Sequence, residues 1–110
     1  MFIAMNNFKV NPEKGEDFET VWRTRESHLQ GVAGFVQFAL LKGDDPGDYV
    51  SHSTWESREA FMNWAKSEGF RQAHGGGLAS GVMAGHPVAK FYEAVLVEPG
   101  VTPTAETAPA

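Results

Sequence analysis

The sequence predicts an α+β fold in which one antiparallel sheet carries both helices on one face. Three observations lead to this fold class. Segments with the two-residue period of strands and the 3.6-residue period of helices follow one another in the order β-α-β-β-α-β. A short turn of glycine, aspartate and proline joins the two central strands, which therefore pair directly. Residues 1–97 contain no internal repeat or heptad pattern, and we expect them to form a single ferredoxin-like domain.

The spacing of apolar residues predicts the first strand and the first helix. Residues 2–10 alternate, and one face of this strand carries Phe2, Ala4, Asn6, Phe8 and Val10. The Asn-Pro pair at positions 11 and 12 ends the strand. A helix is expected over residues 15–29, because apolar positions recur there at helical spacing and acidic side chains stand near its start.

Residues 31–97 supply the remaining elements. Gly31 and Gly34 bracket the exit from the first helix, and strands over 35–42 and 49–55 flank a turn to form a hairpin. Ser57 is expected to cap a helix that runs to about residue 67, where Gly69 interrupts it before a short continuation over 70–74. A glycine-rich loop over 75–87 leads to a final strand at 88–97.

The opposite face of the sheet also carries apolar side chains. Ile3 and Met5 point away from the helices, together with members of the strand at 35–41. A sheet face of this kind is usually buried against a partner, so we expect a homodimer packed sheet to sheet.

The composition excludes several classes of function. Nine basic against fourteen acidic residues give a net charge of -5, and the basic residues are scattered, which disfavours nucleic acid or an anionic membrane as a partner. With no cysteine, the chain has no disulfide and no thiolate metal site. No apolar run approaches the length of a membrane span and the start does not resemble a signal peptide, so a cytoplasmic location is expected. The proline-rich residues 98–110 are expected to form a disordered tail.

Two residues stand out on the predicted elements. Asn6 shares a strand face with apolar residues, although strands disfavour asparagine, so its amide is either satisfied by nearby backbone or has a functional role. Trp64 lies on the second helix, where an ordinary core tryptophan would also lie; a wide, rigid indole beside a planar ligand would give the same pattern.

His74 is the most informative of the four histidines. It ends a helix immediately before three glycines, and six of the twelve glycines lie between Gly69 and Gly85. Glycines let the backbone approach a flat ligand closely, and imidazole is a good iron ligand in a chain without cysteine. A histidine at a helix C-terminus followed by a glycine cap is an equally good interpretation. His28, His52 and His86 have no spacing typical of a zinc site.

These residues together resemble a known family. The markers are the asparagine in MNNFKV, the Gly-Phe pair at 34 and 35, and TWESREAFMNWAKSEGFRQAH, which holds Trp64 and His74. In order and separation they are similar to the IsdG-type haem-degrading monooxygenases, within the antibiotic biosynthesis monooxygenase-like dimeric α+β barrels, and most similar to the HmuQ/HmuD-like bacterial haem-utilisation enzymes. The resemblance covers residues 1–97.

The resemblance implies a function and a role for each marker. His74 would be the proximal ligand of the haem iron, Asn6 a hydrogen-bond donor on the distal side, and Trp64 the residue that pushes the porphyrin out of plane. Arg25 and Arg71, with Arg23, are the cations available for the propionates. Haem, as substrate and cofactor, would be cleaved at a meso carbon with O2 and an external electron donor such as a reductase, releasing iron and an open tetrapyrrole.

Three other functions fit parts of the sequence. A cofactor-free monooxygenase acting on a quinol-like aromatic substrate could use asparagine and tryptophan on the same fold, but would not need His74. A haem-binding or haem-buffering protein without turnover would keep the ligand and lack the chemistry. A small dimeric interaction domain would have Trp64 in its core and His74 as a plain helix end.

Overall fold

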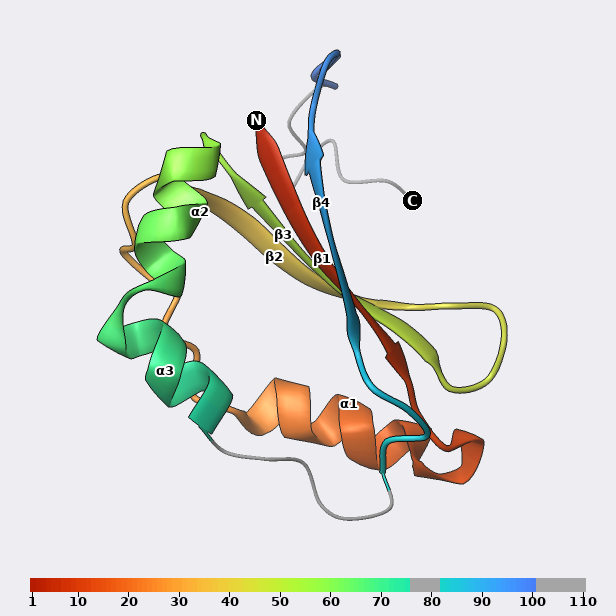
Figure 1. Ribbon diagram of the computed structural model, residues 1–110. Helices are drawn as coiled ribbons and strands as arrows, with labels where there is room; N and C mark the ends of the chain where they lie inside the picture. Colours follow the sequence, from red (N-terminus) through yellow and green to blue (C-terminus); the bar gives the residue numbers. More distant parts are fainter. Residues whose placement is uncertain (76–81, 101–110) are drawn as a thin grey trace, which may run out of the picture.

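The computed structural model describes residues 1–75 and 82–100 and confirms the α+β fold (Figure 1). One antiparallel sheet has the strand order β2-β3-β1-β4. The strands are β1 (Phe2–Lys9), β2 (Phe35–Lys42), β3 (Asp48–Trp55) and β4 (Val88–Glu93). The helices are the 3-10 turn η1 (Pro12–Lys14), α1 (Gly15–Thr24), α2 (Arg58–Ala65) and α3 (Glu68–Gly75).

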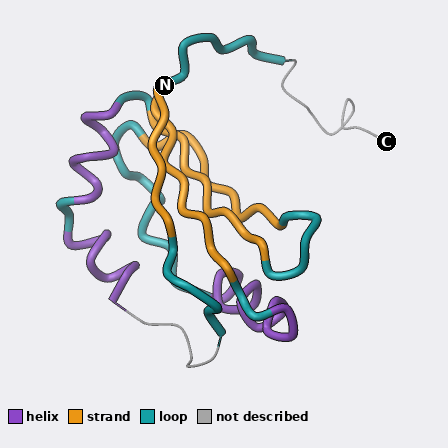
Figure 2. The backbone as a smooth tube through the Cα atoms, turned by 45° about the vertical axis from the view of Figure 1, so that its right-hand side comes forward, coloured by secondary structure: helices purple, strands orange, loops and turns teal. Residues whose placement is uncertain are grey.

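The helices lie on one side of the sheet, as the sequence predicts. Helix α2 runs beside it near the start of β1, α1 lies below its other end, and α3 lies between these two helices (Figure 1; Figure 2). The predicted alternation along β1 holds, because Phe2 and Phe8 contact aromatic rings of α2 and α1 respectively. Ile3 and Met5 therefore face away from the helices, as expected.

Helix α1 is shorter than the sequence predicts, ending at Thr24 instead of residue 29. Arg25 is extended, with φ -67° and ψ 153°. The physical reason is that Trp22 packs at one end of the sheet while Leu29 is buried in the core at the other end, so one straight helix could not place both. His28 falls within the predicted helix range 15–29, near its end, but it lies in the loop that makes this crossing.

The break in the second helical segment lies earlier than predicted. Helix α2 begins after Ser57, whose Oγ accepts a hydrogen bond from Ala60 N at 3.1 Å, as expected. It ends at Ala65, and Ser67 then caps α3 by accepting from Phe70 N at 3.1 Å while donating to Trp64 O at 2.6 Å. Gly69 does not interrupt the helix but lies in the first turn of α3. The serine hydroxyl, which satisfies backbone groups at both helix ends, therefore decides the break.

Strand β4 is also shorter than the predicted 88–97. Its pairing with β1 ends where Glu93 meets Phe2, and the last backbone bond joins Ala94 N to Met1 O at 2.9 Å. Beyond that point β1 offers no further backbone groups. At the other end of β1, Val10 forms an isolated bridge with Met83 instead of extending the strand.

The hairpin agrees closely with the prediction. Strand β2 has the predicted bounds and β3 begins one residue earlier, with Gly43 N donating to Asp48 O at 2.7 Å across the turn. Gly34 has φ +78°, and an added Cβ would stand 2.4 Å from the Ala60 Cβ, so the glycine lets the loop pass close to α2.

Three further expectations concern a membrane-spanning segment, the glycine-rich loop and the C-terminal tail. No helix within residues 1–75 and 82–100 is both long and apolar enough to cross a membrane. Residues 76–81 of the glycine-rich loop and residues 101–110 of the expected tail lie outside the described residues.

Candidate functional site

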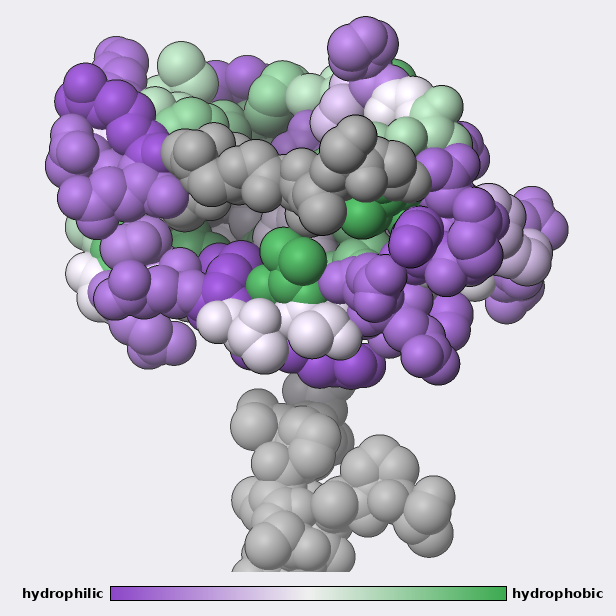
Figure 3. All heavy atoms as spheres, turned by 90° about the horizontal axis from the view of Figure 1, so that it is seen from below, coloured by the Kyte–Doolittle hydropathy of each residue, from purple (hydrophilic) through white to green (hydrophobic). Residues whose placement is uncertain are grey.

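The helix-covered face of the sheet carries two separate aromatic cores. The first contains Phe2, Ala4, Leu29, Trp55 and Trp64, and the second contains Phe8, Val10, Phe18, Tyr49 and Val82. Figure 3 views the molecule from below, where polar residues form much of the rim and apolar residues appear between them. Two cores on one face leave a stretch of sheet between them that neither core fills.

Asn6 lies in this stretch. It is half-buried and follows Ala4 of the first core and precedes Phe8 of the second on the same strand face. Its partner across the ladder is Ser51, which is 7% exposed. The Asn6 amide forms no hydrogen bond with any side chain described in residues 1–72 and 82–100, so in this part of the protein its donor and acceptor are available to a ligand.

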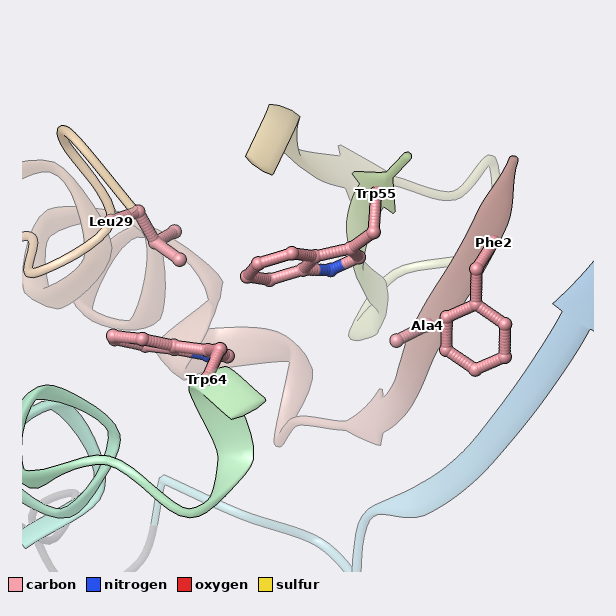
Figure 4. Packing of buried hydrophobic residues seen from close by; sticks show 5 residues of the cluster. All are labelled: Phe2, Ala4, Leu29, Trp55 and Trp64. Atoms are coloured by element: carbon pink, nitrogen blue, oxygen red, sulfur yellow. The ribbon is translucent and has the colours of Figure 1, made fainter. Parts of the chain in front are cut away.

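Trp64 belongs to the first core, with only 7% of its surface exposed. Its ring stacks on Trp55 with centroids 6.3 Å apart at 27°, and meets the Phe70 ring edge-on at 5.9 Å and 81°. Figure 4 shows the two indoles lying nearly parallel, with Leu29 beside them. A Cβ added at Gly69 would stand 2.9 Å from Trp64 Cζ3, so the backbone of α3 holds the ring in place.

Trp64 also lines a surface cavity of about 540 Å³ between the loop over residues 28–34 and α2. His28, Glu56, Glu59 and Asn63 are among the other lining residues. Trp64 is therefore a core residue, and part of its indole ring also borders this cavity. Asn6 does not line this cavity, so the cavity and the polar stretch of the sheet are different places.

The backbone places His74 in the last turn of α3, as expected, and its side chain lies outside the described residues. The C-terminal end of a helix favours a positive charge and orients an imidazole. The other histidines are apart from one another, and the described residues contain no group of three or more histidine and carboxylate side chains that could hold a metal ion. His86 is exposed.

The structure separates the three candidate cations. Arg23 pairs with Glu19 at 3.0 Å and its side chain is 74% exposed, and Arg71 pairs with Glu68 at 3.4 Å with 71% exposed. Arg25 is half-buried, and burial lowers its pKa. Its guanidinium carbon lies 4.9 Å from the ring centroids of both Trp22 and Phe38. These two rings stack at 5.5 Å and join the two cores on the β2 side.

A polar cluster, which the sequence pattern does not reveal, lies next to Arg25. Tyr49, 2% exposed, donates its hydroxyl to Glu19 at 2.5 Å, and Lys42 approaches the same carboxylate at 3.4 Å. The hydrogen bond from Tyr49 is the main cause that holds the pKa of Glu19 below its usual value. Burial, with the same hydrogen bond, raises the pKa of Tyr49 to about 12. Strand alternation could have placed Tyr49 on this face, but its partner on α1 follows only from the tertiary fold.

Comparison with known proteins gives three results. Residues 1–76 match the family model described as antibiotic biosynthesis monooxygenase. A haem-degrading monooxygenase from Listeria welshimeri is 34% identical over 87 residues, which are 68% of this chain and 70% of the relative; the one from Listeria monocytogenes gives the same values.

The solved structures include two of the haem degrader MhuD. Its complex from Mycobacterium tuberculosis, with two haems bound in the active site, has 28% identity and a TM-score of 0.72, over 90% of this chain and 100% of that one. An arginine-to-serine variant of MhuD with two manganese protoporphyrin IX molecules per active site has 28% identity and a TM-score of 0.75, over 91% and 100%.

Proposed function

We propose that this chain, which belongs to the antibiotic biosynthesis monooxygenase family, binds haem and degrades it. The porphyrin would be cleaved at a meso carbon with O2 and electrons from an external donor, leaving free iron and an open tetrapyrrole. The names of the Listeria relatives and the haem-bound MhuD structures support this activity. The observation that carries the proposal for this chain is Asn6, an amide without a hydrogen-bond partner among the described residues, between two aromatic cores on the helix-covered face.

The residues present suit a flat, wide, mostly apolar substrate. Trp64 and Phe70 supply aromatic surface at the first core and Trp22 at the second, while Phe38 on β2 belongs to the first core and stacks on Trp22. A chain without cysteine offers imidazole as the natural ligand for iron, and His74 is the histidine at the end of α3. Apolar walls with few polar groups are typical of cofactor-sized ligands.

Each residue has a separate role in this proposal. The haem group supplies O2 binding and redox chemistry when bound. His74 would hold the iron from one side. The Asn6 amide N–H would orient the oxygen-bearing side of the substrate, since a fixed dipole aimed at developing charge stabilises a transition state. Trp64, wedged between Trp55 and the backbone at Gly69, would press on the macrocycle as a rigid surface.

Arg25 is the cation that we propose for the substrate's carboxylates. It lies half-buried beside Trp22 and Phe38, next to the helix-covered face. Arg71 is exposed and paired with Glu68 on the surface of α3, so we propose for it at most a peripheral contact.

We also propose that the chain forms a homodimer through the open face of its sheet. Val88 and Tyr92 on β4 and Leu41 on β2 are 54%, 47% and 44% exposed on this face. The segment that follows β4 is more apolar still, with Val95 and Leu96 97% and 75% exposed. Light scattering of the purified chain tests this, since a monomer at micromolar concentration would contradict it and Tyr92→Lys should weaken a dimer.

A haemin titration followed by addition of reductant tests the proposed function. We expect saturable binding with a Soret band typical of histidine ligation, and bleaching of that band by ascorbate or by NADPH with a reductase in air. His74→Ala should change the spectrum, whereas the matched variant of the exposed His86, His86→Ala, should leave it intact. An unchanged His74→Ala spectrum would refute the ligand assignment.

Turnover separates the proposal from its alternatives. Asn6→Ala and Trp64→Phe should slow bleaching while haem still binds. Binding without bleaching would identify a haem-buffering protein. No binding at all would leave a cofactor-free monooxygenase or an interaction domain, and oxygen consumption with a quinol-like substrate would then distinguish these two.

A further inference from the structure

Two hydrogen-bond donors at the edge of the second core have no partner. Trp22 Nε1 and Arg25 Nε are both shut off from solvent, and neither bonds to any atom of the described residues. These two are the buried side-chain polar atoms found without a partner in residues 1–75 and 82–100. Folded proteins pair nearly all such groups, so each exception needs an explanation, and a missing ligand is one.

The two donors belong to one small site. The Arg25 guanidinium carbon lies 4.9 Å from the Trp22 ring centroid and 4.9 Å from that of Phe38. The two rings stack directly on each other, with centroids 5.5 Å apart at 16°, and the guanidinium packs beside this stacked pair, in contact with both rings. All three residues line a cavity of about 420 Å³ that extends to Tyr49 and Lys42.

The positive charge of Arg25 is not neutralised by the carboxylate that lines this cavity. Glu19 is the carboxylate of this cavity, and it is engaged by Arg23 at 3.0 Å, Lys42 at 3.4 Å and the Tyr49 hydroxyl at 2.5 Å. Arg25 forms no ion pair within the described part of the chain. A buried guanidinium without an anion is unfavourable, and a bound carboxylate would relieve that cost.

The site also lies within reach of Asn6. Phe38 is on β2, and β1 is two strand spacings away, about 10 Å. A flat ligand that covers Asn6 can therefore extend a side arm to the cavity edge. Two N–H donors match the two oxygens of a carboxylate better than they match a single acceptor.

We infer that Trp22 Nε1–H and Arg25 Nε–H together bind a carboxylate of the substrate. This inference rests on the proposed function, because haem carries two carboxylate arms. It adds Trp22 as a specificity-determining residue, whose contribution is an indole N–H that phenylalanine would lack.

Esterification of the substrate provides the test. Haemin and haemin dimethyl ester are titrated separately into the wild type, Trp22→Phe, Arg25→Gln and the control Arg58→Gln, with absorbance as the readout. We expect the wild type to bind haemin at least tenfold more tightly than the ester. Trp22→Phe and Arg25→Gln should each lose about tenfold in haemin affinity, which corresponds to about 1.4 kcal/mol, and nothing for the ester. Arg58→Gln removes the same charge from an exposed position on α2 that does not line this cavity, and it should change both affinities less than twofold.

The outcomes separate the two proposals. Equal wild-type affinity for haemin and ester, or equal losses for both ligands in Trp22→Phe and Arg25→Gln, would overturn the carboxylate site while haem binding stands. Binding of neither porphyrin by the wild type would refute the proposed function together with this site. Arg25 follows the last residue of α1, so Arg25→Gln keeps the test valid if Trp22→Phe does not fold.

Discussion

Replacing Gly69 by alanine tests whether the backbone of α3 holds Trp64 in place. In most helices this substitution stabilises the protein, by up to about 1 kcal/mol. Here the added Cβ would stand 2.9 Å from Trp64 Cζ3 and 3.4 Å from His28 Cβ. The indole is 7% exposed and stacked on Trp55, so it cannot turn aside as a flexible side chain would.

The expected sign is therefore the reverse of the helix propensity. Overpacking of a filled core costs about 1 to 3 kcal/mol. After subtraction of the propensity gain, we expect Gly69→Ala to lower the free energy of unfolding by up to about 2 kcal/mol. For a domain near this size, each kcal/mol corresponds to a change in Tm of about 4 to 8 °C.

A double-mutant cycle isolates the contact with Trp64. Trp64→Phe replaces the indole by a smaller ring that lacks the outer atoms, Cζ3 among them. Gly69→Ala in that background should therefore be neutral or stabilising. Urea unfolding of the four proteins, followed by circular dichroism, gives a coupling energy expected near 2 kcal/mol. A Gly69→Ala variant that is more stable than the wild type would show that the ring has room to move. It would also remove the basis for treating Trp64 as a rigid surface against the substrate.

Two other substitutions test the loop geometry and the polar cluster. Gly34 and Gly31 share φ +78°, so alanine at either should cost about 1 to 2 kcal/mol for the left-handed backbone, but Gly34→Ala also meets the Ala60 Cβ at 2.4 Å. Chemical unfolding should show Gly34→Ala to be the more destabilising by at least about 1 kcal/mol, with Ala60→Gly recovering the difference. Tyr49 has its pKa raised to about 12, so its native environment contributes stability below pH 10 that is lost as pH rises toward 12. Tyr49→Phe should lack this loss in unfolding curves and lack the matching late change in absorbance at 295 nm.

Local patterns in the sequence were enough to predict most of the fold. The strand alternation, the hairpin turn and the Ser57 cap each depend on neighbouring residues, and all three are confirmed. The errors occur where distant contacts decide an element's length. Helix α1 ends five residues early because Leu29 is needed in the other core, and β4 ends at Glu93 because β1 begins there.

The site was predictable to a smaller extent, for a physical reason. Asn6 is an anomaly in its own strand, so its position between apolar residues can be detected without any tertiary information. Trp22 and Trp64 are not anomalies, because an amphipathic helix requires large apolar side chains on the face they share with the core. Pattern alone cannot say whether an indole N–H is satisfied, and this depends on residues far along the chain: Trp55 Nε1 donates to Ser53 at 2.9 Å, whereas Trp22 Nε1 has no partner among the described residues.

The same reasoning applies to the arginines. In the sequence Arg23, Arg25 and Arg71 are equivalent cations. In the structure Arg71 is exposed on α3 and paired with Glu68, and the termination of α1 distinguishes Arg25 from Arg23. A helix that continued past Thr24 would leave Arg25 on the helical path, whereas the extended backbone at Arg25 accompanies the packing of its guanidinium against Trp22 and Phe38. The early end of α1 thus has two effects, since it delivers Leu29 to the first core and places a partly buried cation beside the second. A substitution that extended α1 would disturb both effects at once, so the stability of the first core and the charge at the candidate site are coupled through this one turn.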